Sequence, residues 1–239
     1  MRFARFFFTK TQKKIASAPL RWYTIHKEDP LSRFFGDESR TKEKKMAKLY
    51  FKYGVMGSAK SAQALITKFN YEERGMRVWL IKPSVDTRDG AAAVSSRIGL
   101  SADAEIITPE TDIVRLFRSH PRTDVIIADE CQFFTEKHID QLRFLVDGYG
   151  VPALCFGLRT DFRTRLFPGS RRLFEVADSI TEIKSMCECG NKAIVNARIG
   201  TDGRVVTEGE QVMLGGNDRY IELCHRCWVD RIRREEDET

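Results

Sequence analysis

The sequence predicts an α/β fold, in which a parallel β-sheet is covered by helices on both faces, followed by a smaller C-terminal unit. Three observations support this prediction. Apolar, strand-like segments alternate with helical ones from residue 46 to about residue 183, a short glycine-containing loop joins the first strand to the first helix, and two close cysteine pairs follow. Apolar strands that alternate with helices are typical of a parallel sheet buried on both sides.

The elements can be assigned from the periodicity of the apolar residues. Strands are predicted at 49–53, 77–81, 124–128 and 151–156, and helices at 61–74, 111–119 and 135–146. After about residue 183 the pattern changes, because strand-like pieces at 193–199 and 205–206 lie among glycine-rich turns. We therefore predict a second, smaller unit from residue 184 to the charged end of the chain.

The formal net charge of +6 is concentrated at the start of the chain. Residues 1–45 hold 12 Lys and Arg against 5 Asp and Glu, whereas the remainder holds 28 against 29. Because the main part is near neutral, its charge does not predict nucleic-acid binding. We interpret residues 1–45 as a disordered or dispensable extension, with a targeting peptide or membrane-surface arm as the alternative. No apolar run is long enough to predict a membrane span.

The loop GVMGSAKS between the first strand and helix has the pattern of a nucleotide-phosphate cradle. In such a loop the backbone N–H groups and the helix N-terminus bind phosphate oxygens, a lysine reaches the outer phosphates and a hydroxyl binds Mg²⁺. Ala59 stands where a glycine is usual, and a left-handed backbone there would cost about 1 kcal/mol relative to glycine. The predicted phosphate-binding residues are Gly54, Val55, Met56, Gly57, Ser58, Ala59, Lys60 and Ser61.

Two adjacent acids, Asp129 and Glu130, follow the predicted strand 124–128. An aspartate at the end of such a strand is well placed to hold Mg²⁺ together with Ser61. Glu130 then remains available to accept a proton from an attacking hydroxyl group. The alternative interpretation is a solvated acidic strand end, which is common in loops.

The cysteines divide into two isolated residues, Cys131 and Cys155, and the two pairs Cys187/Cys189 and Cys224/Cys227. Four thiolates from two turns can surround Zn²⁺ tetrahedrally and stabilise a small unit with little core of its own. His225 is a possible substitute ligand. Because no secretory signal is present, thiols this close are better explained as metal ligands than as disulfide partners, and the predicted compartment is the cytoplasm.

The ordered set YGVMGSAKS, KPSVDTRDG, DECQFF, FGLRTDF and LGGNDRYIELCHRC resembles the type II thymidine kinase family, the zinc-containing tetrameric kind. The resemblance covers residues 46–228. It implies a P-loop sheet, a small zinc-binding lasso domain, and transfer of the ATP γ-phosphoryl group to the 5′-hydroxyl of thymidine, with deoxyuridine as another acceptor. It also implies a homotetramer and feedback inhibition by thymidine triphosphate.

The resemblance further assigns roles to single residues. It implies Glu130 as catalytic base, Asp129 and Gln132 in the nucleotide-binding segment, and Asp86 and Arg88 near the phosphates and magnesium. Gly215 and Gly216 would mark the turn of the lasso. The implied thymine-binding residues, each of which is also explained as ordinary core, are Met56, Phe133, Leu158, Phe162, Phe167 and Tyr220. Ala59 departs from the family pattern, while the Cys187/Cys189 spacing resembles that of a bacterial branch.

Two alternative functions remain open from the sequence. One is a zinc-ribbon nucleic-acid-binding protein with a vestigial nucleotide fold, against which the near-neutral main part argues. The other is a P-loop ATPase or a kinase for another small metabolite. The preferred prediction is an ATP-dependent thymidine kinase that binds neither nucleic acid nor membrane. Its predicted organisation is an extension over 1–45, a nucleotide-binding α/β domain over 46–183, and a zinc-binding lasso domain with a charged tail over 184–239.

Overall fold

The structure, a computed structural model, describes residues 46–85, 92–211 and 219–237. The predictions for residues 1–45, for Asp86 and Arg88, and for Gly215 and Gly216 lie outside these ranges. Among the described residues, no helix has both the length and the apolar character needed to cross a membrane.

A six-stranded sheet forms the centre of the protein, in the order β5-β2-β6-β7-β1-β8. Every neighbouring pair in it is parallel, which confirms the predicted parallel sheet. The carboxyl ends of its strands therefore lie along one edge, where β1, β6 and β7 lead into the predicted site. The strands are β1 (Leu49–Tyr53), β2 (Val78–Pro83), β5 (Glu105–Ile107), β6 (Val125–Ala128), β7 (Ala153–Gly157) and β8 (Ser179–Glu182).

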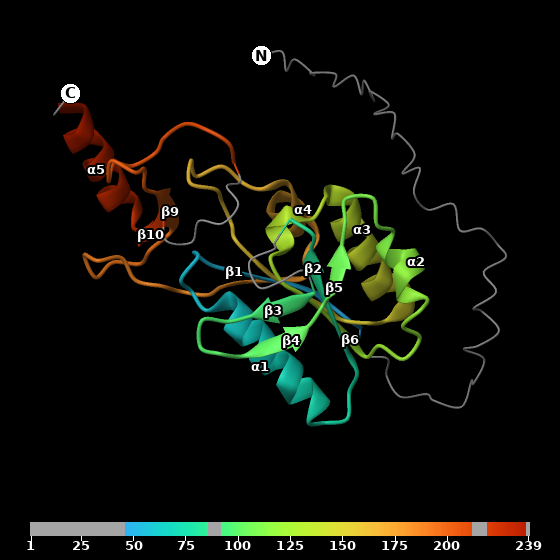
Figure 1. The fold of residues 1–239 in the computed structure, drawn as a ribbon. Coiled ribbons are helices and arrows are strands. Elements are labelled where there is room, and N and C mark those ends of the chain that lie inside the picture. Colours follow the sequence, from blue (N-terminus) through green and yellow to red (C-terminus); the bar gives the residue numbers. More distant parts are fainter. Residues whose placement is uncertain (1–45, 86–91, 212–218, 238–239) are drawn as a thin grey trace, which may run out of the picture. The chain divides into compact units, whose positions relative to one another are not determined.

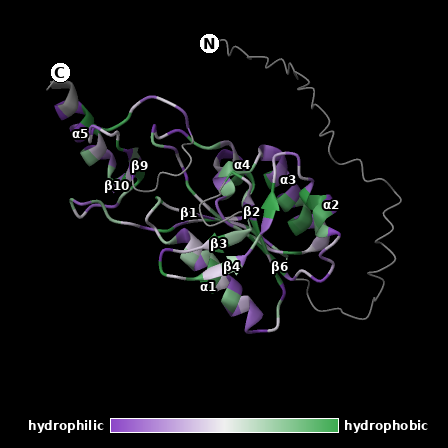
Figure 2. Cartoon of the chain, viewed as in Figure 1, coloured by the Kyte–Doolittle hydropathy of each residue, from purple (hydrophilic) through white to green (hydrophobic). Residues whose placement is uncertain are grey.

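Helices cover both faces of the sheet, as predicted (Figure 1). On β6, Ile126 and Ala128 pack in one core with residues of α2 (Ile113–Phe117), α3 (Glu136–Phe144) and α4 (Pro168–Val176). The alternate residues of β6, Val125 and Ile127, pack on the other face of the sheet. Their neighbours there belong to α1 (Lys60–Glu72) and to the hairpin of β3 (Ala93–Ser95) and β4 (Ser101–Asp103). Figure 2 shows hydrophobic and hydrophilic residues alternating along α1, as expected for a helix with one buried face.

Several element ends differ from the prediction. The helix predicted at 111–119 is shorter, and the side chain of Asp112 caps its start by accepting a hydrogen bond from the Arg115 N–H group. The helix predicted at 135–146 ends as a wider turn, Leu145–Tyr149. Helix α4 and strand β8 were not predicted, because the glycine and serine at the start of α4 interrupt its apolar period and β8 is half exposed.

The C-terminal region contains β9 (Val195–Arg198), which pairs in antiparallel fashion with β10 (Tyr220–Leu223), and α5 (His225–Asp237). We call β9, β10, α5 and the four paired cysteines the cysteine module. Its small core combines Ala193, Ala197 and Leu223 with cysteines and with Val55 from the loop after β1. Residues 45–239 form one compact unit, so the predicted domain boundary near residue 184 stays a prediction.

Candidate active site and cysteine cluster

The loop between β1 and α1 has the geometry of a phosphate cradle. It starts where the Gly54 N–H group donates to the Gly157 carbonyl at 3.2 Å, and α1 begins at Lys60. Ala59, which precedes the helix, adopts the left-handed conformation with φ of 57° and provides no side-chain cap. No Ala59 side chain therefore covers the start of α1, where the N–H groups of a helix can bind an anion.

Two glycines of this loop lie close against other parts of the protein. A Cβ atom on Gly54 would lie 2.3 Å from the Ser58 Oγ and 2.6 Å from the Ile183 carbonyl oxygen. A Cβ atom on Gly57 would lie 2.0 Å from a carboxylate oxygen of Glu222, a residue of β10. Gly54 therefore requires glycine, because the backbone carbonyl of Ile183 leaves no room for a side chain there. The Glu222 side chain could move away from a residue at position 57, so Gly57 marks a direct contact with the cysteine module.

Asp129 lies beside this loop. Its carboxylate is hydrogen bonded by the Ser61 side chain, and the charge of Lys60 also acts on it. Burial is the largest influence and the charge of Glu130 the second, and together they raise the pKa of Asp129 from 3.8 to about 7. The phosphate loop and the acidic pair, more than sixty residues apart in sequence, therefore form one site.

A divalent cation fits this arrangement. The Asp129 Oδ1 atom is buried without a hydrogen-bond partner, which is unusual for a carboxylate oxygen. Oxygen ligands from a carboxylate and a hydroxyl group suit Mg²⁺. The donor set of Ser61 and Asp129 is thus compatible with the predicted magnesium site.

Glu130 is held in a fixed position by its neighbours. Its backbone is left-handed, with φ of 49°, and its side chain is nearly buried. The Gln132 Nε2 atom donates to the Glu130 Oε2 at 2.5 Å, while the Gln132 Oε1 accepts from the Leu158 N–H group at 2.9 Å. Gln132 is 0% exposed, so its side chain links the acidic pair to the end of β7. Its predicted contact with nucleotide stays a prediction.

The predicted thymine-binding residues form two groups. Phe133 and Phe167 meet edge to face, with ring centroids 5.6 Å apart. Phe162 and Tyr220 are instead joined through Arg198, whose guanidinium lies 3.8 Å from the centroid of Phe162 and 5.4 Å from that of Tyr220. The remaining two predicted residues, Leu158 and Met56, are held through their backbones. The Leu158 N–H group donates to the Gln132 side chain, and the Met56 N–H group donates to the Asn196 side chain.

Three buried polar residues near these loops were missed by sequence reasoning: Asp161, Asn196 and Arg198. Asp161 accepts hydrogen bonds from the backbone N–H groups of Arg163 and Arg165, which shapes the loop after β7. Asn196 and Arg198 alternate with apolar residues in the predicted strand 193–199. A polar residue at every second position of a strand bounded by apolar segments is the signal that could have revealed them.

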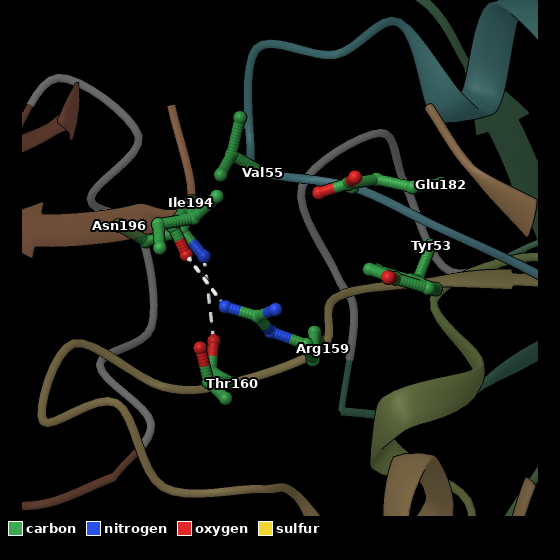
Figure 3. Close-up of a pocket in the computed structure, with 8 residues that line it drawn as sticks. Tyr53, Val55, Arg159, Thr160, Glu182, Ile194 and Asn196 are labelled. Atoms are coloured by element: carbon green, nitrogen blue, oxygen red, sulfur yellow. Dashed lines mark hydrogen bonds between the residues drawn. The ribbon is translucent and has the colours of Figure 1, made fainter. Parts of the chain in front are cut away.

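A small pocket lies where the phosphate loop, the loop after β7 and the cysteine module meet (Figure 3). Figure 3 shows Arg159 reaching from the loop after β7 toward β9. Its guanidinium donates to the Ile194 carbonyl at 3.4 Å, and the Asn196 Nδ2 donates to the Thr160 carbonyl at 3.3 Å. The phosphate loop therefore borders the module directly.

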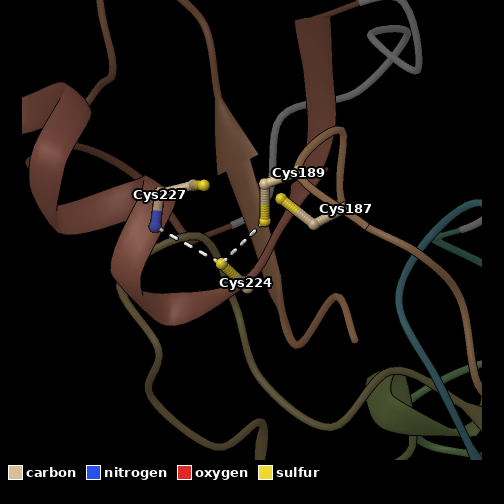
Figure 4. Close-up of side chains that lie close together, drawn as sticks. All are labelled: Cys187, Cys189, Cys224 and Cys227. Atoms are coloured by element: carbon tan, nitrogen blue, oxygen red, sulfur yellow. Dashed lines mark hydrogen bonds between the residues drawn. The ribbon is translucent and has the colours of Figure 1, made fainter. Parts of the chain in front are cut away.

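The four paired cysteines converge (Figure 4). Their Sγ atoms lie within 4.8 Å of one another, and those of Cys189 and Cys224 are 3.7 Å apart. Four sulfurs around Zn²⁺ at about 2.3 Å in a tetrahedron would be separated by about 3.8 Å. Among the described residues this group contains Cys187, Cys189, Cys224 and Cys227 but not His225, whose exposed ring packs on Trp228 instead.

The surroundings of the cluster favour the thiolate form at Cys189. Hydrogen bonds from the backbone and side chain of Asn191 lower the pKa of Cys189 to about 6, whereas the hydrogen bond with Cys189 raises the pKa of Cys227. A divalent cation stabilises the deprotonated form of each of its sulfur ligands. The cluster is therefore chemically and geometrically fit to hold one tetrahedral metal ion.

The comparisons with known proteins agree with this site. Residues 47–228 match the family model described as thymidine kinase. A thymidine kinase from Agrobacterium fabrum is 42% identical over 188 residues, which cover 77% of this chain and 97% of that protein. A thymidine kinase from Enterobacteria phage T4 is 44% identical over 192 residues, which cover 79% of this chain and 99% of that protein.

Among solved structures, a Pif1 helicase from Candida albicans matches with a TM-score of 0.35 and 14% identity over 59% of this chain and 36% of that one. That likeness is too distant to bear on the function. The family match spans the phosphate loop, the acidic pair and all four clustered cysteines. The chain therefore belongs to the thymidine kinase family.

Proposed function

We propose that this protein transfers the γ-phosphoryl group of ATP to the 5′-hydroxyl of thymidine, and also of deoxyuridine. The single observation that carries the proposal is the hydrogen bond between Ser61 and Asp129. It joins a phosphate-binding loop and an adjacent pair of acids in one site, as phosphoryl transfer to a hydroxyl group requires. Family membership supplies the identity of the acceptor.

The donor side binds the phosphates of ATP. The first-turn N–H groups of α1 and the ammonium of Lys60 provide positive potential for the outer phosphate oxygens. The Lys60 Nζ donates to the Val55 carbonyl at 2.6 Å, which places the ammonium over the loop. Ser61 and Asp129 would hold Mg²⁺, which neutralises charge on the β- and γ-phosphate oxygens when it is bound.

The acceptor side activates the nucleoside hydroxyl group. Glu130 accepts the proton of the 5′-hydroxyl as that oxygen attacks the γ-phosphorus, and ADP leaves as the bond to its β-phosphate breaks. Gln132 holds the Glu130 carboxylate through the 2.5 Å hydrogen bond. We assign the base pocket to Met56, Phe133, Leu158, Phe162, Phe167 and Tyr220, and the predicted roles of Asp86, Arg88 and Gln132 toward ATP stay proposals.

The remaining proposals concern assembly, regulation and compartment. Zn²⁺ at the four cysteines would stabilise the cysteine module. All six cysteines are free thiols, which fits the reducing cytoplasm that we propose as the compartment. The family resemblance supports a homotetramer, with thymidine triphosphate as a feedback inhibitor that occupies the acceptor site.

The function is tested with γ-labelled ATP, Mg²⁺ and a panel of nucleosides. We expect the label to appear in thymidine and deoxyuridine monophosphates, and ADP to form only when nucleoside is present. ATP hydrolysis that proceeds equally well without nucleoside would instead identify an ATPase. A gel-shift assay at physiological salt adds a second check, since tight binding of DNA by a protein that begins at Met46 would favour the nucleic-acid-binding alternative.

A further inference from the structure

The two-stranded sheet of the cysteine module has two different faces. Ala197 and Leu223 lie in the apolar core beside the cysteines. The buried Val195 pairs with Leu223 and lies two residues from Ala197, so it belongs to the same side of the sheet. Successive side chains of a strand point to opposite faces, so the alternate residues point away from that core. They form two cross-strand pairs, Asn196 opposite Glu222 and Arg198 opposite Tyr220.

The first pair contacts the phosphate loop. The Asn196 Oδ1 accepts the N–H group of Met56 at 2.8 Å, and Asn196 is 3% exposed. Glu222 lies directly against Gly57. Val55, the residue before Met56, is part of the apolar core of the module. Three consecutive residues of the phosphate loop therefore contact the module.

These contacts extend to the ATP-binding lysine. The Val55 carbonyl accepts hydrogen bonds from the Ser58 Oγ at 2.8 Å and from the Lys60 Nζ at 2.6 Å. A displacement of residues 55–57 would therefore move the groups on which Lys60 and Ser58 rest. Loss of the Asn196 oxygen would also leave the Met56 N–H group without this acceptor, which favours such a displacement.

The second pair contacts the acceptor side. The Arg198 guanidinium stacks at 3.8 Å over Phe162, which is 1% exposed. The Arg198 Nε donates to the Tyr220 hydroxyl at 2.8 Å, and its Nη1 donates to the Glu210 carbonyl at 2.8 Å. One buried cation thus fixes two of the proposed base-binding residues.

We propose that Asn196 and Arg198 are positioning residues with separate targets. Asn196 holds the phosphate loop in the conformation that binds ATP, and Arg198 holds Phe162 and Tyr220 in the conformation that binds nucleoside. Strand β9 thereby couples the cysteine module to both substrates. The kinetic readout rests on the proposed function, but the binding and exchange readouts below do not.

The test compares the KM values of three variants on this strand. We expect Asn196→Ala to raise the KM for ATP about five- to tenfold and the KM for thymidine less than about twofold. Arg198→Met should raise the KM for thymidine about five- to tenfold and the KM for ATP less than about twofold. Val195→Ala is the matched control, because its side chain lies on the apolar face, and it should lower Tm and leave both KM values unchanged.

Two measurements independent of turnover complete the test. Amide hydrogen exchange over residues 55–57 should accelerate in Asn196→Ala and not in Val195→Ala, and calorimetric binding of MgATP should weaken only in the former. If Asn196→Ala does not fold, Asn196→Ser replaces it, and failure of both to fold would assign Asn196 to stability alone and overturn the proposal. Equal changes of both KM values in the Asn196 and Arg198 variants would also overturn it. An inactive wild type with intact MgATP binding would refute the kinase function alone.

Discussion

The hydroxyl group of Ser61, in the first turn of α1, is hydrogen bonded to the carboxylate of Asp129 at the end of β6. This contact and the charge of Lys60 lower the pKa of Asp129, but burial and Glu130 outweigh them and raise it to about 7. The folded protein therefore binds a proton at Asp129 more readily than the unfolded chain, in which the pKa is near 3.8. The stability that results is present below pH 4 and is lost as the pH rises through 7.

The first prediction concerns this pH dependence. Without nucleotide or magnesium, stability should fall between pH 5 and pH 8, and Asp129→Asn should reduce that fall by on the order of 2 kcal/mol. Burial lowers the pKa of His138, and this makes the stability rise as the pH rises through that range. The contribution of His138 is the same in both proteins, so it cancels in the comparison. Urea unfolding at the two pH values measures the difference. Identical pH profiles for the two proteins would contradict the shifted pKa.

The second prediction concerns the proposed base. Glu130→Gln should lower kcat by about 10²- to 10⁴-fold, because the amide cannot take the proton of the hydroxyl group. The amide oxygen can still accept the hydrogen bond from Gln132, so the affinity for ATP should change less than about twofold. Glu136→Gln, on the exposed first turn of α3, is the control and should be fully active. A Glu130→Gln variant that keeps more than about half of the wild-type kcat would exclude Glu130 as the base.

The third prediction separates positioning from stability at Gln132. Gln132→Leu loses the hydrogen bonds to Glu130 and to the Leu158 N–H group, so we expect kcat to fall about tenfold and Tm to fall as well. Gln141 makes a similar pair of hydrogen bonds, to the Ile113 N–H group and to Asp112, at the junction of α2 and α3. Gln141→Leu should therefore lower Tm and leave kcat unchanged. Equal effects of the two substitutions on kcat would remove the positioning role.

The sequence predicted correctly that the phosphate loop joins a strand to a helix and that the acidic pair follows a buried strand, and the reason is local chemistry. Gly54, Lys60 and Ser61 lie within one strand–loop–helix segment, so their spacing alone defines the cradle. Asp129 and Glu130 follow an apolar strand, and strands of a parallel sheet end at one edge. The structure confirms that the two segments meet, although their catalytic roles stay proposals.

The polar face of β9 could not be predicted in the same way. The hydrogen bond between Asn196 and Met56 joins residues 140 positions apart, and no local pattern specifies which loop a buried side chain will reach. The stacking of Arg198 on Phe162 is likewise a tertiary contact. Strands β3 and β4 were missed for another reason, since each has three residues and β4 is largely exposed. Short, polar strands carry too little periodicity to be recognised.

The fourth prediction concerns the cysteine cluster. Protein purified without chelator should contain about one Zn²⁺ per chain, and Cys227→Ala should lose it. Loss of the metal should loosen the cysteine module and raise the KM for thymidine, because Tyr220 lies on β10. Cys155→Ala is the control, since Cys155 is buried in the sheet core away from the cluster and should keep the metal. Metal analysis of the wild type that finds no zinc would refute the assignment.

The last prediction uses the strained residue at the start of α1. Ala59 has φ of 57°, in the region that favours glycine, and its side chain is exposed. Ala59→Gly should therefore stabilise the protein by up to about 1 kcal/mol, which corresponds to a rise in Tm of roughly 2–4 °C. Ala62→Gly, three residues later, should do the reverse, because it removes a buried methyl group from a helix interior. Thermal unfolding monitored by circular dichroism measures both. If both substitutions lowered Tm, Ala59 would not be strained in the wild type.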